Sequence, residues 1–101
     1  MKIHYFVTFL TLFAVQNLLG QNSVEALLSK GIEAHDKGEY YNAVDFYKEA
    51  LQIDKNAAIL FYELSLSYYH LKDYKNGKIN AEKCLQSFPQ YSKCQPLAES
   101  C

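Results

Sequence analysis

The stretch EYYNA at residues 39–43 returns 34 residues later as DYKNG at residues 73–77. The first Tyr and the Asn are identical, and the acidic residue before them and the small residue after them also recur. Outside this stretch, the dipeptide Leu-Gln recurs at the same spacing. A period of this length is the sequence signature of a repeat protein. It divides the chain into a first copy at residues 24–57 and a second copy at residues 58–91.

The pattern within each copy predicts two helices joined by a tight turn. Apolar and small side chains recur every three or four residues, which is helical spacing. This spacing is interrupted at Gly38, at residues 54–56 and before Pro89, where helices are expected to end. No alternating apolar run of strand length is found. The spacing therefore predicts an all-α fold with helices near residues 23–37, 40–53, 58–71 and 74–87.

Small residues occupy the positions at which the two helices of a copy must approach each other. Antiparallel helices joined by a tight turn come close only where their side chains are small. We therefore expect six small residues in these interfaces. They are Gly31, Ala43 and Ala50 in the first copy and Ser65, Gly77 and Cys84 in the second.

This pattern resembles the tetratricopeptide repeat, a 34-residue helix–turn–helix unit with the consensus W-x2-L-G-x2-Y…A-x3-F…P. The matching positions in the second copy are Phe61, Leu64, Ser65, Tyr68, Gly77 and Pro89, and those in the first are Leu27, Gly31, Ala43 and Tyr47. Lys30, Ala34 and Ala81 depart from the consensus. The resemblance covers about 68 of the 81 residues that follow residue 20. It implies two tandem repeats that form an α-solenoid.

Residues 1–20 are expected to be a signal peptide rather than part of the fold. Lys2 makes the start positive, residues 5–15 (YFVTFLTLFAV) form an apolar run, and Gly20 is a small residue at the expected cleavage site. The run is shorter than the roughly 20 apolar residues of a transmembrane helix, and an uncleaved anchor is the alternative. A resemblance to exported bacterial proteins agrees with cleavage after Gly20. The mature protein would then be periplasmic or extracellular, without a membrane attachment.

Cleavage would leave a two-repeat domain at residues 21–91 and a segment at residues 92–101 that opens a third copy without completing it. Stacked repeats usually need about three copies for stability, and the helix near residues 74–87 would normally be covered by a following helix. Three interpretations stay open. The tail forms a short helix that caps the stack, another chain covers this face, or the sequence is a piece of a longer array.

The three cysteines, Cys84, Cys94 and Cys101, allow three pairings with one thiol left over. Cys84 occupies a small-residue position, so a buried free thiol is one expectation. The other is a Cys84–Cys94 disulfide, which a turn near Pro89 would permit and which would hold the tail over the last helix. A Cys94–Cys101 bond does not suit a helical tail. Seven residues of helix span about 10.5 Å, which is more than the Cα–Cα distance that a disulfide can bridge. Cys101 is therefore expected to be free or to pair with another chain.

Composition and motifs argue against catalysis and against nucleic-acid binding. Ten Lys, no Arg and eleven acidic residues give a net charge of -1, which lacks the basic excess of a nucleic-acid-binding protein. No HExxH, GxSxG, Walker or GxGxxG motif occurs, and His35 and His70 lack the spacing of a zinc helix. We expect no enzyme activity, no metal and no cofactor. The first copy has four Lys against seven acids and the second four against three, so end-to-end self-association stays open.

The resemblance also implies where a partner would bind. In the family, the first helix of each repeat lines a concave groove that holds a peptide or a partner helix. The corresponding residues here are Leu28, Ile32, His35, Asp36, Ile59, Tyr62, Leu66, Tyr69 and His70. Family members that grip a terminal carboxylate use Lys, Asn and Arg in this groove. Leu28 and Ile32 stand at such sites, so that mode is not expected.

The residues of the second copy agree in part with this placement. Tyr62, Leu66 and Tyr69 lie on the side of their helix away from the stripe that packs within the repeat, and a leftover apolar patch of this kind suggests a partner. The alternative is that these side chains pack on the tail or on one another. The sequence predicts a non-catalytic module that binds a protein or peptide. A structural element that stacks on other repeats or self-associates is the second interpretation.

Overall fold

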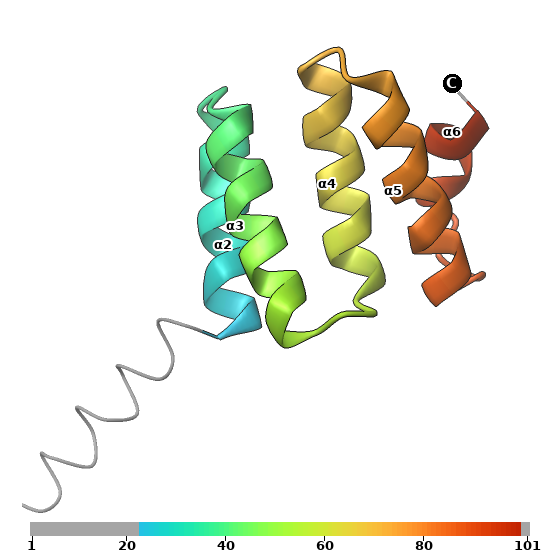
Figure 1. The fold of residues 1–101 in the computed structure, drawn as a ribbon, viewed down its shortest axis with the longest axis horizontal. Coiled ribbons are helices and arrows are strands. Elements are labelled where there is room, and N and C mark those ends of the chain that lie inside the picture. Colours follow the sequence, from blue (N-terminus) through green and yellow to red (C-terminus); the bar gives the residue numbers. More distant parts are fainter. Residues whose placement is uncertain (1–22, 100–101) are drawn as a thin grey trace, which may run out of the picture.

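The computed structural model in Figure 1 describes residues 23–99. This part of the chain contains helices, turns and loops but no strand. The helices are α2 (Val24–Asp36), α3 (Tyr40–Ile53), α4 (Ala58–His70), α5 (Tyr74–Ser87) and α6 (Cys94–Glu99). The predicted all-α fold is confirmed, and the four long helices lie within one residue of their expected bounds. The signal peptide expected at residues 1–20 lies outside the described residues, as does Cys101.

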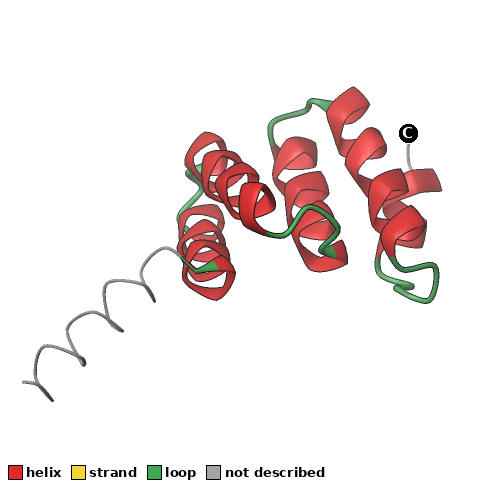
Figure 2. Cartoon of the chain, turned by 60° about the horizontal axis from the view of Figure 1, so that its bottom comes forward, coloured by secondary structure: helices red, strands yellow, loops and turns green. Residues whose placement is uncertain are grey.

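The helices form an array in which each packs beside its neighbour in sequence (Figures 1 and 2). α2 with α3, and α4 with α5, are antiparallel hairpins, and the contact between α3 and α4 joins the two. α2 also touches α4, so the first helices of the two repeats lie next to each other. The arrangement is the expected α-solenoid. No helix between residues 23 and 99 has the length and hydropathy needed to cross a membrane.

The turn inside each hairpin has the same backbone conformation in both repeats. Gly38 has a φ of 80° and Lys72, at the equivalent position 34 residues later, a φ of 63°. In each turn, this left-handed residue and the one after it donate their N–H groups to carbonyls near the end of the preceding helix, at 2.9 Å in all four bonds. Such a pair of bonds is a Schellman motif, which satisfies carbonyls that a helix end leaves unpaired. The hairpin reversal is therefore made by the left-handed residue just before the recurrent stretch together with the first residue of that stretch, Glu39 or Asp73.

The core of the first repeat depends on a close approach between Gly31 in α2 and Tyr47 in α3. A Cβ atom placed on Gly31 would lie only 2.3 Å from Cε1 of Tyr47. The Tyr47 side chain is fully buried, in a cluster that also holds Ala43, Ala50 and Leu60. Glycine at residue 31 therefore leaves the space that the tyrosine ring fills.

The second repeat fills the same interface with a different pair. Ser65 and Ala81 stand at the positions equivalent to Gly31 and Tyr47, so both sides are small. The large ring is instead Tyr69 of α4, which lies 3.2 Å from the place where a Cβ on Gly77 would be. The buried Ser65 hydroxyl donates to the Gly77 carbonyl oxygen at 2.7 Å. All six small residues expected in the interfaces are buried.

The segment after Pro89 forms α6, which packs against α5 as α4 packs against α3 and touches α4 as α4 touches α2. It thus takes the place of the first helix of a third repeat. A disulfide joins Cys84 in α5 to Cys94 in α6, and both residues are fully buried. The equivalent residues one repeat earlier, Ala50 and Leu60, belong to one buried cluster. The disulfide therefore lies where the preceding interface has an apolar contact.

Candidate functional site

The nine residues predicted to line a groove lie on α2 and α4, the neighbouring first helices of the two repeats. Their exposure is uneven. Leu28 and Ile59 are half-buried and pack against the core of the first repeat. Ile32 is 37% exposed, and Leu66 is half-buried. The α2 half of this face therefore presents apolar side chains that the protein's own core covers only in part.

Aromatic rings join the two helices at the C-terminal end of this face. The rings of His35 and His70 are 4.9 Å apart between centroids, and Tyr40 of α3 stacks on His70 at 4.7 Å. His35 is also 5.0 Å from Tyr40, and its Nδ1 lies 2.9 Å from the Ser67 hydroxyl oxygen. Burial lowers the pKa of His35, the nearby His70 adds to this, and Asp36 acts against it. His35 therefore contacts the second repeat through both its ring and its Nδ1, and its lowered pKa favours the neutral form.

Sequence analysis did not place Tyr40 or Ser67 at this face. Tyr40 begins α3 and therefore does not lie on a first helix, where the family resemblance places the groove. Ser67 was not singled out at all. The available signal was the repeat period: His35 and His70 are 35 residues apart, one residue more than the period, so they lie near the same end of equivalent helices that pack side by side.

Residues of the tail cover the α4 half of the face. The ring of Tyr62 meets that of Tyr91 at 5.9 Å, and the Lys93 ammonium lies 5.7 Å from the Tyr62 ring centre. The Tyr69 hydroxyl donates to the carbonyl oxygen of Leu97 in α6. The structure thus groups Ile32, Leu66 and the His35–His70 pair as partly exposed residues of the face, while Tyr62 and Tyr69 contact the tail.

A half-buried carboxyl group, that of Glu63 on α4, also belongs to this region and was not predicted. Burial raises the pKa of Glu63 and the negative charge of Asp36 adds to it, whereas the Tyr47 hydroxyl and the Lys93 ammonium act in the opposite direction. The same burial, with the Glu63 charge, raises the pKa of Tyr47. Two carboxyl groups, those of Glu63 and Asp36, therefore lie on this side of the face, with the Lys93 ammonium close enough to act on Glu63.

Two further features of residues 23–99 concern metal-ligating and oppositely charged side chains. Among residues 23–99, no three His, Cys, Asp or Glu side chains come together in a way that could hold a metal ion. A side-chain ion pair in this range, Lys37 with Glu33 at 3.0 Å, is solvent-exposed within α2. Such pairs contribute little to stability. The face offers apolar, aromatic and charged side chains to a partner.

Known proteins resemble this chain in sequence over both repeats. The tetratricopeptide repeat family model matches residues 24–57 and 58–91. A curated relative, the heat shock protein sti1 homolog of Schizosaccharomyces pombe, is 33% identical over 69 residues. The match covers 68% of this chain but only 12% of that protein. Repeats of this kind generally serve protein–protein interaction. Since the two family matches span most of the chain, the protein belongs to the tetratricopeptide repeat family.

Proposed function

We propose that the protein is a non-catalytic interaction module that binds a segment of another protein on the shared face of α2 and α4. The observation that carries this proposal is the partly exposed apolar side chain of Ile32, 37% accessible, beside the half-buried Leu28 and Leu66. A partner that covers these side chains removes apolar surface from water, which favours binding by about 25 cal/mol for each Å² buried. The binding face would comprise the nine predicted residues, with the tail modifying access to Tyr62 and Tyr69.

The charges at this face favour a partner segment that is apolar and carries at least one Lys or Arg. Asp36 is exposed and Glu63 is half-buried, and each offers a carboxyl group to a cation. Leu28 and Ile32 replace the polar residues that a terminal carboxylate would need. An internal segment of the partner is therefore the expected ligand, rather than its C-terminus.

The stacking interpretation is the second candidate, and the position of α6 argues against its simplest form. A free face of α5 would be the natural surface for another repeat. In the structure, α6 lies on α5 and is joined to it through Cys84 and Cys94. Self-association would have to displace α6 or use a different face, whereas the α2 face is accessible without rearrangement.

The proposal includes export to a bacterial periplasm or to the outside of the cell. The apolar run at residues 5–15 supports it, and so does the Cys84–Cys94 disulfide, because such bonds persist mainly in oxidising compartments. Expression of the full chain in a bacterium, followed by mass spectrometry of the periplasmic protein, should give a start at Gln21. Recovery of the protein only in the cytoplasm with residues 1–20 attached would contradict export.

Binding can be tested with matched substitutions of equally exposed isoleucines. A peptide selected from a random dodecamer library on the full chain would be labelled, blocked at both ends and titrated by fluorescence polarisation. Ile32→Glu should lower its affinity at least about tenfold, the equivalent of roughly 1.4 kcal/mol. Ile79→Glu, on α5 and also 37% exposed, should change it less than about twofold. Equal effects of the two variants, with unchanged circular dichroism, would overturn the proposal.

A further inference from the structure

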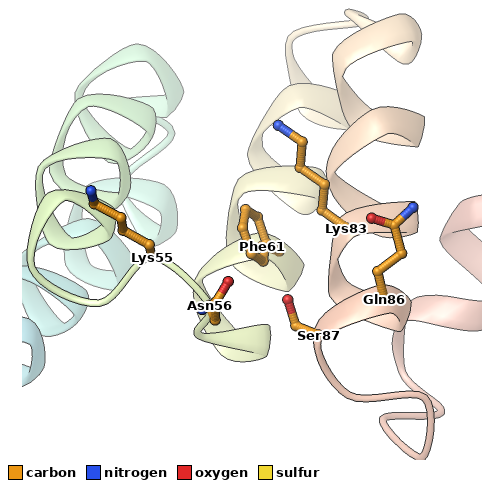
Figure 3. A pocket seen from close by; sticks show the side chains of 6 residues that line it. All are labelled: Lys55, Asn56, Phe61, Lys83, Gln86 and Ser87. Carbon is orange, nitrogen blue, oxygen red and sulfur yellow. The ribbon is translucent and has the colours of Figure 1, made fainter.

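A hollow lies away from the α2–α4 face, beside the C-terminal ends of α3 and α5. Its volume is about 600 Å³, within the range of roughly 300–1,000 Å³ that is typical of ligand sites. None of the nine predicted groove residues lines it. Figure 3 shows its side chains, which are Lys55, Asn56, Phe61, Lys83, Gln86 and Ser87.

The polar lining of this hollow consists of hydrogen-bond donors and carries no carboxylate. Lys55 comes from the loop after α3 and Lys83 from α5, on either side of Phe61, and in the view of Figure 3 the Lys55 ammonium extends away from Phe61. Neither lysine forms an ion pair or a side-chain hydrogen bond with another described residue. Asn56, Gln86 and Ser87 add amide and hydroxyl donors. Two lysines therefore line one hollow that has no carboxylate in its lining, although the Asp54 carboxylate, next to Lys55 in sequence, accepts from the Asn56 backbone N–H at 3.3 Å.

Apolar groups accompany these charges. Phe61, only 8% exposed, lies between the two lysines and contributes to the floor. Two large apolar residues at the ends of the same helices are well exposed, Ile53 at 56% and Phe88 at 50%. Each of them is within two residues of a lining residue. The ligand that fits must therefore combine negative charge with an apolar side chain.

We propose that this hollow binds an acidic segment of a partner protein, in which Asp or Glu carboxylates lie on both sides of an apolar side chain. One carboxylate contacts Lys55 and another contacts Lys83, while the apolar side chain lies over Phe61. The amide and hydroxyl groups donate to the carboxylates or to the peptide carbonyl oxygens. Because exposed ion pairs are individually weak, of the order of 0.2–1 kcal/mol each, both lysines and the apolar contact are needed together.

This site is independent of the α2–α4 face and takes a ligand of opposite charge. Its probe is the peptide Glu-Asp-Phe-Glu-Asp-Leu, acetylated and amidated so that it has no terminal charge, with Gln-Asn-Phe-Gln-Asn-Leu as its uncharged counterpart. Both are titrated into the full chain by fluorescence polarisation near 0.15 M salt, where exposed charges more than about 8 Å apart are largely screened. Amide NMR spectra record which residues respond.

The substitutions Lys55→Glu and Lys83→Glu are compared with Lys75→Glu and Lys78→Glu. The second pair lies at exposed positions of α5 and changes the net charge by the same amount. The proposal expects at least a tenfold loss of affinity for the first pair, less than about threefold for the second, and NMR shifts at Asn56, Gln86 and Ser87. Equal losses for both pairs would refute it, since attraction would then be unspecific. Equal binding of the uncharged peptide, displacement by millimolar inorganic phosphate, or no binding by the unaltered chain would also overturn it.

Discussion

The close approach of Gly31 and Tyr47 makes a strong prediction, because it reverses the usual effect of replacing a helical glycine. In a helix interior, Gly→Ala ordinarily stabilises by about 1 kcal/mol. At residue 31 the new Cβ would lie 2.3 Å from a ring carbon of Tyr47, more than 1 Å inside ordinary contact. The ring is fully buried and cannot swing into solvent. Overpacking costs about 1–3 kcal/mol, and contacts this short with a buried ring put this substitution in the upper part of that range, at about 2–3 kcal/mol.

The expected net effect of Gly31→Ala is a loss of about 1–2 kcal/mol, measured by urea unfolding followed by circular dichroism. For a domain of this size, each kcal/mol corresponds to roughly 4–8 °C in Tm. Gly77→Ala is the matched control, because the nearest ring there is 3.2 Å away and the first repeat already has Ala43 at the equivalent site. It should change the free energy of unfolding by less than about 0.5 kcal/mol, since strain and helix propensity nearly cancel.

Removing the Tyr47 ring should reverse the effect of Gly31→Ala on stability. Tyr47→Ala gives residue 47 the side chain of its equivalent, Ala81, at a cost of about 3–5 kcal/mol by analogy with other aromatic deletions. In that background, Gly31→Ala meets no ring and should stabilise by up to about 1 kcal/mol. The two substitutions would then be coupled by about 2–3 kcal/mol. If Tyr47→Ala alone unfolds the protein, the comparison of residues 31 and 77 remains decisive. A Gly31→Ala variant as stable as Gly77→Ala would refute the reasoning.

Three further predictions concern the turns, the disulfide and one histidine. Lys72→Gly should raise the free energy of unfolding by about 1 kcal/mol and Gly38→Ala should lower it similarly, because both positions have a left-handed backbone. Opposite signs in urea unfolding would contradict this account of the turns. Reduction of the Cys84–Cys94 bond, whose cysteines are ten residues apart, should cost about 2–3 kcal/mol and expose the amides of α6 to hydrogen exchange. Unchanged exchange would show that α6 docks without the bond. His35 should titrate below its ordinary pKa of 6.5 in NMR spectra. As the pH decreases, the unfolded chain therefore binds a proton at this histidine before the folded protein does, and the free energy of unfolding should fall as the pH decreases through about 6.5. A titration midpoint of His35 at or above 6.5 would contradict this.

The repeat period is what made most of the fold predictable. Residues 39–43 and 73–77 place both turns, and the bounds of the four long helices follow from them. The period does not reveal how the interface between helices is filled. Gly31 and Gly77 were both identified as small residues, but the rings that occupy the space beside them, Tyr47 and Tyr69, come from opposite helices of their hairpins. That choice depends on side-chain packing in three dimensions, which spacing alone does not encode.

The candidate site was predictable as a set of positions but not as a surface. Family resemblance placed all nine residues on α2 and α4, because their spacing follows the period. It could not show that Tyr62 and Tyr69 contact residues 91 and 97, since the tail does not complete a repeat and its docking has no sequence signature. The disulfide was left open for the same reason. Glu63 was missed because its burial arises from neighbours far away in sequence.

The placement of large and small side chains has a consequence for the gene. An exchange between the two copies in the connection at residues 54–57 would keep each ring with the glycine that accommodates it. A crossover within a hairpin would instead combine Ser65 with Tyr47, which collide, or Gly31 with Ala81, which leave a void. Internal recombination should therefore be tolerated only at hairpin boundaries, so each hairpin is inherited as an indivisible unit despite the similarity of the two copies.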